Sequence, residues 1–378
     1  MSNQPSSRKP RVAVVFGGRS SEHAISVVTA GAVLRAIDRD KYDVLPIGIT
    51  TDGRWALTAD DPSRMAIADR ALPNVAQLTE SCDGTVLLPV DPASREVVYS
   101  EPGSVPKALG DVDVVFPMLH GPYGEDGTLQ GLLELSGVPY VGSGVLSSAV
   151  GMDKEYMKRV FTSFGLPVGP YVVVRPREWE NDPAAARAKV VDFAAAHGWP
   201  VFVKPARAGS SMGISKVDDL AGLDAAIEEA RRHDPKVLVE SLLRGREIEC
   251  GVLEFEDGPR ASVPAEIPPV TAHDFYDFEA KYIDSAEGVV PAPLTPEQTA
   301  EVQRLAVAAF DAASCEGLVR ADFFLQDDGE FVINEINTMP GFTPISMYPR
   351  MWQESGVGYA ELVDRLIQAA LRRPTGLR

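Results

Sequence analysis

The hydrophobic pattern at the start of the chain alternates short apolar runs with longer segments of helical periodicity. Three apolar runs have the length of buried strands, at residues 12–16, 44–49 and 112–119. Helical periodicity follows two of them, over residues 25–37 and 129–136. Strands that alternate with helices predict an α/β unit built on a parallel sheet.

The rest of the pattern predicts two further units. The second contains helices over 147–164 and 183–197 and strands over 171–174, 201–203 and 236–239. The third contains strands over 249–256 and 261–267 and helices over 297–313 and 358–371. We therefore expect domains at residues 1–145, 146–244 and 245–378. Residues 51–106 are rich in Pro, Asp and Ser and predict an insertion with a few short strands.

Glycine-rich polar loops follow several of the predicted strands. Loops 17–23 and 120–127 come directly after strands of a parallel sheet, where α/β proteins place their ligand sites. His120 in the second loop is equally consistent with a structural histidine. In the second unit, Lys204 precedes the Gly/Ser-rich loop 206–215, whose backbone N–H groups and small side chains suit phosphate oxygens.

The same loop also matches a motif from another class of enzyme. Residues 209–213 read G-x-S-x-G, the nucleophile elbow of α/β hydrolases, with Ser211 as the nucleophile. A helix should follow the elbow at once, whereas residues 214–217 predict a strand, so the hydrolase interpretation is disfavoured. The chain contains no G-x-x-x-x-G-K-[ST] motif, and loop 17–23 lacks the G-x-G-x-x-G pattern.

An Asp-Gly pair between two apolar runs predicts a β-hairpin near the C-terminus. With residues 328–329 as the central turn residues, Asp322 pairs with Glu335 and Arg320 pairs with Asn337, all on one face. Opposed carboxylates repel, so we expect a cation there. Asp322, Glu335 and Asn337 offer the oxygen ligands that suit Mg²⁺ shared with phosphates. The competing interpretation is a solvated acidic face, and a loop of another length would shift the register.

Two other segments could contact a nucleotide or close over a site. In residues 240–247, Glu240, Leu243 and Glu247 could hold the edge of an adenine, its ring and a ribose, although a plain strand and turn fits equally well. Residues 271–293 form a long irregular segment with aromatic and charged side chains, which is typical of functional or mobile loops.

Composition narrows the possible partners and the compartment. A chain of 378 residues predicts two or three domains, and its formal charge of −18 argues against nucleic acid and anionic membranes as partners. No apolar run reaches the length of about 18 residues that a membrane span needs. The first eleven residues are polar, unlike a secretion signal. Cys82, Cys250 and Cys315 are few and far apart, so we expect reduced, buried thiols in the cytoplasm.

Five motifs together resemble one family of enzymes. They are F-G-G-R-S-S-E-H-A-I-S, L-H-G-P-Y-G-E-D-G, V-K-P-A-R-A-G-S-S-M-G, Y-D-F-E-A-K-Y and N-E-I-N-T-M-P-G-F-T. In this order, over residues 12–371, they resemble the D-alanine–D-alanine ligase family. The resemblance implies an α/β (α+β) three-domain ATP-grasp fold with a Rossmann-like N-terminal domain. It also implies ligation of two D-alanine molecules through a D-alanyl phosphate, with ATP and two Mg²⁺ ions (Mn²⁺ as a substitute), for peptidoglycan synthesis. K⁺ activation and a homodimer are further family expectations.

The resemblance also implies roles for individual residues. The metal ligands would be Asp322, Glu335 and Asn337. The ATP contacts would be Lys154, Lys204, Ser210, Ser211, Glu240, Leu243, Glu247, Lys281, Asn334 and Glu335. The substrate contacts would be Glu22, His120, Lys281, Tyr282, Arg320, Ser346 and Met347. Catalysis would rest on Glu22, Ser210, Tyr282, Arg320 and Gly341, and hydrogen bonds would link the first three of these.

Two alternatives remain beside the dipeptide ligase. A D-alanine–D-lactate ligase would have a similar closing loop but would lack a tyrosine at the position of Tyr282. A nucleotide-binding regulator without turnover is disfavoured because Arg320, Asp322 and Glu335 are intact. The chain departs from some family members at residues 122–123, where it has Pro-Tyr, which weakens the assignment of His120.

Overall fold

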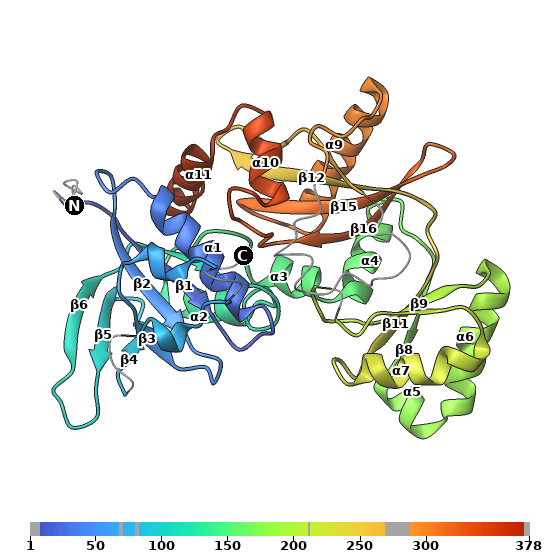
Figure 1. The fold of residues 1–378 in the computed structure, drawn as a ribbon, viewed down its shortest axis with the longest axis horizontal. Helices are drawn as coiled ribbons and strands as arrows, with labels where there is room; N and C mark the ends of the chain where they lie inside the picture. The colour runs from blue at the N-terminus through green and yellow to red at the C-terminus, as the bar shows by residue number, and fades with distance from the viewer. Residues whose placement is uncertain (1–7, 68–70, 80–82, 211, 269–287, 374–378) are drawn as a thin grey trace.

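The computed structural model describes residues 8–67, 71–79, 83–210, 212–268 and 288–373 (Figure 1). Its N-terminal sheet has the strand order β3-β2-β1-β7. Three parallel neighbours form its centre, namely β1 (Arg11–Gly17), β2 (Asp43–Ile49) and β7 (Val114–Met118), and β3 (Trp55–Leu57) pairs antiparallel at the edge. Helices α1 (His23–Ala36) and α2 (Thr128–Ser136) follow β1 and β7. The predicted α/β unit is therefore confirmed.

The predicted insertion contains a small sheet of its own. Strands β4 (Thr85–Leu87), β5 (Glu96–Ser100) and β6 (Lys107–Asp111) pair antiparallel in that order. Strand β7 is consequently shorter than the run at 112–119 suggested, because β6 ends at Asp111 and the polypeptide then turns into the parallel sheet.

A second sheet forms a separate lobe with the order β10-β9-β11-β8 (Figure 1). All its pairs are antiparallel, between β8 (Tyr171–Val174), β9 (Val201–Pro205), β10 (Ser215–Val217) and β11 (Val237–Ser241). Helices α6 (Pro183–His197) and α7 (Leu223–Arg231) pack on it, and α5 (Pro176–Asn181) packs against α6 with Trp179 in the same core. We call this unit, residues 171–241, the central lobe.

The third sheet is built on the long strand β12 (Gly245–Phe255). It has the order β13-β12-β15-β16, with β14 also paired to β12. The other strands are β13 (Gly258–Ala261), β14 (Ala265–Ile267), β15 (Leu318–Gln326) and β16 (Phe331–Asn337). The accompanying helices are α9 (Pro296–Ala312), α10 (Met347–Glu354) and α11 (Tyr359–Arg372). Of the strand expected over 261–267, only residues 265–267 form a strand, β14, because β13 ends at Ala261.

The segment expected to form one helix up to Phe164 forms two. Helix α3 spans Val145–Met152 and helix α4 spans Lys154–Ser163. Asp153 separates them because its backbone is extended (φ −97°, ψ 101°), and its side chain accepts hydrogen bonds from the N–H groups of Glu155 and Tyr156. Lys154 is consequently the first residue of a new helix.

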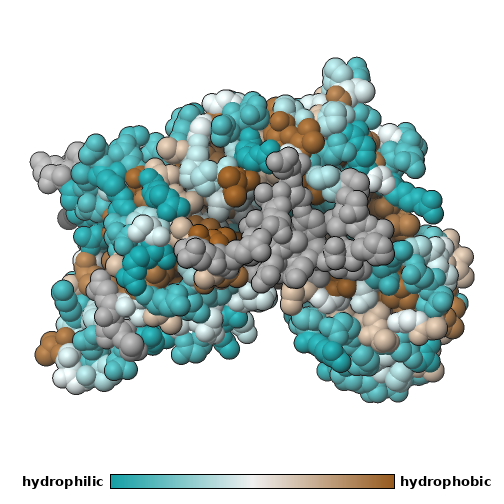
Figure 2. All heavy atoms as spheres, in the orientation of Figure 1, coloured by the Kyte–Doolittle hydropathy of each residue, from teal (hydrophilic) through white to brown (hydrophobic). Residues whose placement is uncertain are grey.

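Hydrophobic packing joins the two ends of the chain. Val14 and Phe116 of the N-terminal sheet share a core with Trp352 and Leu366 of α10 and α11. Helix α11 lies beside α1 (Figure 1). The central lobe has a different core, including Val190, Ile227 and Val239, and it stands apart from the N-terminal part on the face shown in Figure 2. The lobe and the joined ends are thus distinct packing units.

The C-terminal hairpin has the predicted pairing but a different turn. Asp322 pairs with Glu335, and Arg320 with Asn337, as expected. Nearer the turn, however, Leu325 pairs with Phe331, one residue out of step with that register. The loop between paired residues Gln326 and Glu330 holds residues 327–329 rather than two residues, and Gly329 adopts φ +89°.

A β-bulge restores the register before the polar face begins. The irregularity falls between Asp322 and Phe323, whose partners are Glu335 and Ile333, so Asn334 is the extra residue. The longer loop and the bulge cancel each other. The assumption of a two-residue turn was wrong, and the pairing that it predicted is nevertheless present.

Candidate active site

A cavity of about 630 Å³ lies where the N-terminal domain, the central lobe and the C-terminal sheet meet. Its wall includes most of the residues that the sequence singled out, namely Glu22, His120, Lys154, Lys204, Ser210, Glu247, Arg320, Asp322, Asn334, Glu335, Asn337, Gly341, Ser346 and Met347. Ser211, Lys281 and Tyr282 lie outside the described residues, as does most of loop 271–293. Glu240 and Leu243 are not on the wall of this cavity.

The first-domain loops and the glycine/serine loop meet at the carboxylate of Glu22. The hydroxyl of Ser210 donates a hydrogen bond to Glu22 Oε1, so two members of the expected Glu22–Ser210–Tyr282 set are in contact. A Cβ on Gly121 would lie 2.7 Å from Glu22 Oε2, and one on Gly209 would lie 3.1 Å from it. Both loops therefore reach this carboxylate as bare backbone, and Gly121 in addition adopts φ +72°, which favours glycine.

Lys154 connects the glycine/serine loop with the C-terminal hairpin. Its backbone N–H donates to the carbonyl of Ala206 (3.0 Å), and its Nζ donates to the carbonyl of Ala208 (2.9 Å). The same Nζ lies 3.3 Å from Glu335 Oε2. The ammonium group is thus placed between a loop suited to phosphates and a predicted metal ligand.

Glu240 is held by two lysines in the interior. Its carboxylate pairs with Lys204 and lies 3.1 Å from Nζ of Lys158. Burial opposes its ionisation, but the two ammonium groups lower the pKa of Glu240 to about 2. Lys204 is therefore neutralised by Glu240 in this structure, and the adenine contacts of Glu240 and Leu243 remain predictions.

The polar face of the hairpin contains its own cations. Arg320 makes a bidentate ion pair with Asp322, with Nε–Oδ1 and Nη2–Oδ2 distances of 2.7 Å each. Asn337 Nδ2 donates to Asp322 Oδ2 (3.0 Å). Two opposed carboxylates do need positive charge, as argued from the sequence, but here Arg320 supplies it to Asp322 and Lys154 supplies it to Glu335.

The donor set on this face fits a divalent cation of the magnesium type. Asp322, Glu335 and Asn337 present carboxylate and amide oxygens to the same cavity, and hard cations prefer such ligands. Within the described ranges, no group of three or more His, Cys, Asp or Glu side chains could hold a metal ion, and the third ligand of this set would be the amide oxygen of Asn337. The oxygens of these three residues would share a cation with groups that a substrate brings.

His120 and Glu125 hold the segment that follows the hairpin. His120 Nδ1 lies 3.0 Å from the carbonyl oxygen of Met339, and the N–H of Met339 donates to Glu125 Oε1 (3.0 Å). Glu125 Oε2 also accepts from the N–H of Gly121 (2.7 Å). His120 is thus a satisfied, buried histidine, as the structural interpretation predicted; it also lines the cavity, and its contact with a substrate stays a prediction.

Sequence reasoning missed Glu125, Lys158 and Glu249. Glu125 lies within the L-H-G-P-Y-G-E-D-G motif, and Lys158 lies one helical turn after Lys154, on the same face of α4. Glu249 Oε1 is 3.3 Å from Arg320 Nε, and Glu249 pairs with Asp322 across β12 and β15. The alternation of Glu247 and Glu249 on one strand face was the signal that could have identified it.

The hydrolase interpretation and the cysteine prediction can also be compared with the structure. The glycine/serine loop leads into strand β10, not into a helix, so the geometry of a nucleophile elbow is missing after residue 213. Cys250 and Cys315 are buried free thiols, and burial raises the pKa of each to about 12. Cys82 lies outside the described residues. In the part of the chain that is described, no helix is long and apolar enough to cross a membrane.

The arrangement of these sheets around the cavity is that of the ATP-grasp fold, which the solved ligases similar to this chain share. Two family descriptions match the sequence, the N-terminal part of D-ala D-ala ligase over residues 11–143 and its C-terminal part over residues 160–368. The chain belongs to the D-alanine–D-alanine ligase family, as the motifs predicted.

Individual relatives agree with this assignment. The D-alanine–D-alanine ligase of Streptomyces griseus is 85% identical over 377 residues, which is 100% of this chain and 96% of that protein. The VanG D-Ala:D-Ser ligase from Enterococcus faecalis has a TM-score of 0.81 and 34% identity, covering 96% of this chain and 100% of that one. The D-alanine–D-alanine ligase from Coxiella burnetii has a TM-score of 0.80 and 35% identity, covering 96% and 94%.

Proposed function

We propose that this chain uses ATP to phosphorylate the carboxylate of one D-alanine and joins the resulting D-alanyl phosphate to the amine of a second. The products are D-alanyl-D-alanine, ADP and phosphate, and the dipeptide enters peptidoglycan synthesis. One observation carries the proposal. The Glu22–Ser210 contact and the Lys154–Glu335 ion pair lie on the wall of the same cavity. A group for the ammonium of an amino acid and groups for phosphates are thus within one enclosure.

In the first half-reaction the chain must bring two anions together. Lys154 and Lys204 would offset the charge of the ATP phosphates, with Lys281 as a third lysine implied by the family. Asp322, Glu335 and Asn337 would hold Mg²⁺, which neutralises charge on phosphate oxygens when it is bound. Glu22 would orient the first D-alanine through its ammonium group, with His120 beside it.

In the second half-reaction negative charge develops on the oxygen of the attacked acyl group. Asp322 accepts hydrogen bonds from Nε and Nη2 of Arg320, and the remaining N–H groups of this guanidinium would donate to the oxygen. The N–H of Gly341 would be the second donor, and one such donor contributes about 10²–10³ in rate. His120 and Glu125 hold Met339, two residues before Gly341, which would help to fix the position of this donor. Ser346 and Met347 would receive the carboxylate of the second D-alanine.

Several finer features of the proposal rest on the family resemblance. They are two Mg²⁺ ions with Mn²⁺ as a substitute, activation by K⁺, a homodimer, a cytoplasmic location and the domain boundaries at 145 and 244. Nucleotide contacts of Glu240, Leu243, Glu247, Ser211 and Asn334, and closure through Tyr282, belong to the same group.

A coupled assay of ADP release tests the proposal directly. Purified protein with ATP, Mg²⁺ and D-alanine should release ADP and phosphate in step with the dipeptide, and L-alanine should not replace D-alanine. ATP–Mg²⁺ binding without ADP release for any D-amino acid would establish the regulator alternative instead.

The choice of nucleophile needs a competition experiment. D-Lactate or D-serine is added beside D-alanine across a range of pH, and the products are identified by mass. We expect the dipeptide of D-alanine to dominate, because the curated relatives are named for that product. Efficient depsipeptide formation at neutral pH would contradict the proposal, and a D-alanyl-D-serine product would place the chain with the VanG type of ligase.

A further inference from the structure

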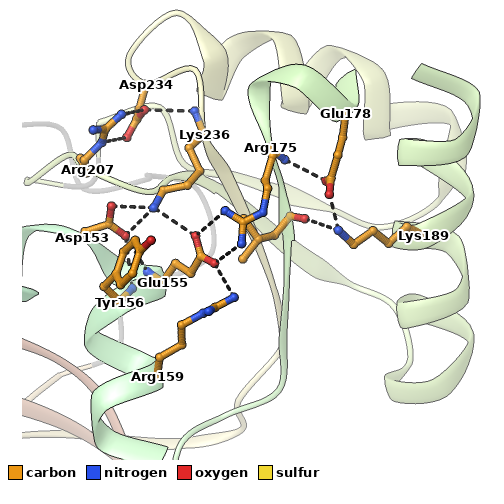
Figure 3. Close-up of polar contacts among 11 residues, drawn as sticks. Asp153, Glu155, Tyr156, Arg159, Arg175, Glu178, Lys189, Arg207, Asp234 and Lys236 are labelled. Carbon is orange, nitrogen blue, oxygen red and sulfur yellow. Dashed lines mark hydrogen bonds and ion pairs between the residues drawn. The ribbon is translucent and has the colours of Figure 1, made fainter. Parts of the chain in front are cut away.

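The central lobe meets the rest of the molecule at the start of helix α4. Met157 and Phe161 of this helix belong to the core of the C-terminal sheet. The core of the central lobe shares no residue with that core among the residues described. Polar contacts at the first turn of α4 therefore decide how the lobe is attached there, and Figure 3 shows them.

Lys236, directly before strand β11 of the lobe, reaches into this turn. Its Nζ lies 2.7 and 2.6 Å from the two carboxylate oxygens of Asp153 and 3.1 Å from Glu155 Oε2. It also lies 4.9 Å from the centre of the Tyr156 ring. Asp153 caps α4 at the same time, so Lys236 binds the residue that starts the helix. Figure 3 shows Lys236 pointing at both carboxylates.

The main chain of Lys236 holds the start of the glycine/serine loop. Its carbonyl accepts a hydrogen bond from the N–H of Ala206 (2.9 Å), and its own N–H donates to Asp234 Oδ1 (3.0 Å). Asp234 in turn makes a bidentate ion pair with Arg207, at 2.8 Å for each contact (Figure 3). Lys236 therefore contacts the glycine/serine loop through its backbone and helix α4 through its side chain.

Lys236 is the buried cation that pairs with the two acids at the start of α4. The side chain of Glu155 is fully buried, and that of Lys236 is 10% exposed. Burial would raise the pKa of Glu155, but Lys236 and then Arg175 hold it below its ordinary value. Arg175 and Arg159 also pair with Glu155, at 2.6 and 2.9 Å, yet both are about half exposed and screened by water.

We propose that Lys236 is a positioning residue that aligns Lys154 and loop 206–210 for the ATP phosphates. Lys154 stands between Asp153 and Glu155, and its ammonium reaches Ala208 of that loop and Glu335 of the hairpin. Removing the Lys236 side chain leaves Asp153 and Glu155 without their shared buried cation, and only the half-exposed Arg175 of the lobe still pairs with Glu155. We expect the start of α4, and Lys154 with it, to be held less firmly against the lobe. The inference rests on the proposed role of Lys154 and the loop in binding ATP.

The test compares Lys236→Met with Lys189→Met. Lys189 forms another lysine–glutamate contact of the central lobe, 3.1 Å from Glu178, and does not reach α4. In K236M we expect the KM for ATP and the dissociation constant of ADP–Mg²⁺, measured by calorimetry without turnover, to rise about ten- to a hundredfold. The KM for D-alanine should stay unchanged. K189M should match the wild type in both, and K236R should recover part of the ADP affinity because it restores the charge.

A purely structural role predicts a different result. If K236M lowers the unfolding temperature but binds ADP–Mg²⁺ like the wild type, the inference is overturned. If K236M does not fold, Asp153→Asn takes its place, because asparagine keeps the helix cap and loses the ion pair. Wild-type ADP affinity in D153N would equally overturn it. Failure of the wild type to release ADP with D-alanine would contradict the proposed function instead. The ADP–Mg²⁺ affinities of K236M and the wild type could still be compared in that case, because their measurement does not need turnover.

Discussion

At the residue scale, Glu335 is both a predicted metal ligand and the partner of Lys154, a predicted phosphate-binding lysine. Its carboxylate pairs with Lys154, and its backbone is the strand partner of Asp322 in the hairpin. We expect Glu335→Gln to lower kcat by about 10²–10³. The mutation removes a charged oxygen ligand and leaves the shape of the strand unchanged. The measurement is ADP release as a function of Mg²⁺ concentration. We expect E335Q to need a higher Mg²⁺ concentration than the wild type for half-maximal release.

The matched control for this prediction is Asp327→Asn in the loop of the same hairpin. Asp327 is exposed and far from the paired polar face. The D327N mutation should leave both kcat and the Mg²⁺ dependence of ADP release unchanged. Wild-type turnover of E335Q at ordinary Mg²⁺ would mean that the hairpin is a charged surface and not a metal site.

Glu125 should make the stability of the protein depend on pH in an unusual direction. Burial, and then the nearby carboxylate of Glu22, raises the pKa of Glu125 from 4.5 to about 8. Between these values the folded state holds a proton that the unfolded chain has lost. Its contribution to the free energy of unfolding is therefore fully present below pH 4.5 and is lost as pH rises toward about 8.

Comparison with Glu125→Gln isolates this effect. The wild-type free energy of unfolding minus that of E125Q should fall by roughly 1.4 kcal/mol per pH unit across the window. Urea unfolding at several pH values from about 5 to 8 measures it. His120, whose pKa burial lowers, contributes the opposite slope but is present in both proteins. Parallel curves would show that Glu125 is ionised in the folded state.

At the element scale, the hairpin shows what a local pattern can and cannot predict. The Asp-Gly signal located the turn and the alternation located the polar face, because both depend on neighbours in sequence. The third loop residue and the bulge at Asn334 were not predictable, because neither changes the alternation near Asp322. Two errors of one residue cancelled. Only the paired structure shows why Asp322 and Glu335 face each other.

Single-residue deletions in this hairpin test its two irregularities one at a time. Deleting Asp328 shortens the loop to Asp327-Gly329, a favoured two-residue turn, and leaves the pairs beyond it in place. Deleting Asn334 removes the bulge, so that Glu335 follows Ile333 directly and still pairs with Asp322 on the polar face. We expect ADP release to survive both deletions, with both proteins folded by circular dichroism. Loss of ADP release in either folded protein would show that the site needs that irregularity and not only the pairing of Asp322 with Glu335.

The helices show a similar division. The amphipathic or alanine-rich segments were predictable, and α6 spans Pro183–His197 as expected. Asp153 was not predicted to break a helix, because its effect depends on its cap and on Lys236, 83 residues away. Most of the candidate site came from motifs. Glu125, Lys158 and Glu249 were missed because their partners become neighbours only in the folded chain.

At the scale of the whole molecule, the way in which the hydrophobic cores are shared between distant segments could not be predicted from the sequence. Three units were predicted from periodicity, and three main sheets are found. Their packing differs from a row of independent domains, because helices α10 and α11 complete a core with the N-terminal sheet. Such long-range packing leaves no local pattern. It joins the two ends of the chain in one core, to which the core of the central lobe does not belong.

This division predicts unequal stability along the chain. Strands β9 and β11 belong to the small core of the lobe, whereas β1 lies in the core that joins both ends. Amides of β9 and β11 should therefore exchange hydrogen through openings of lower free energy than those of β1. Bound ADP–Mg²⁺ should slow exchange in the lobe, by about 2.7 kcal/mol at a hundredfold excess over its dissociation constant. Hydrogen exchange with mass spectrometry measures both.

The K236M variant extends this prediction. In K236M the same nucleotide concentration should protect the lobe less, because Lys236 no longer holds the start of α4 and Lys154 in place. Equal protection of β1 and β11, unaffected by nucleotide, would mean that the molecule opens as one unit and that the cavity needs no movement of the lobe.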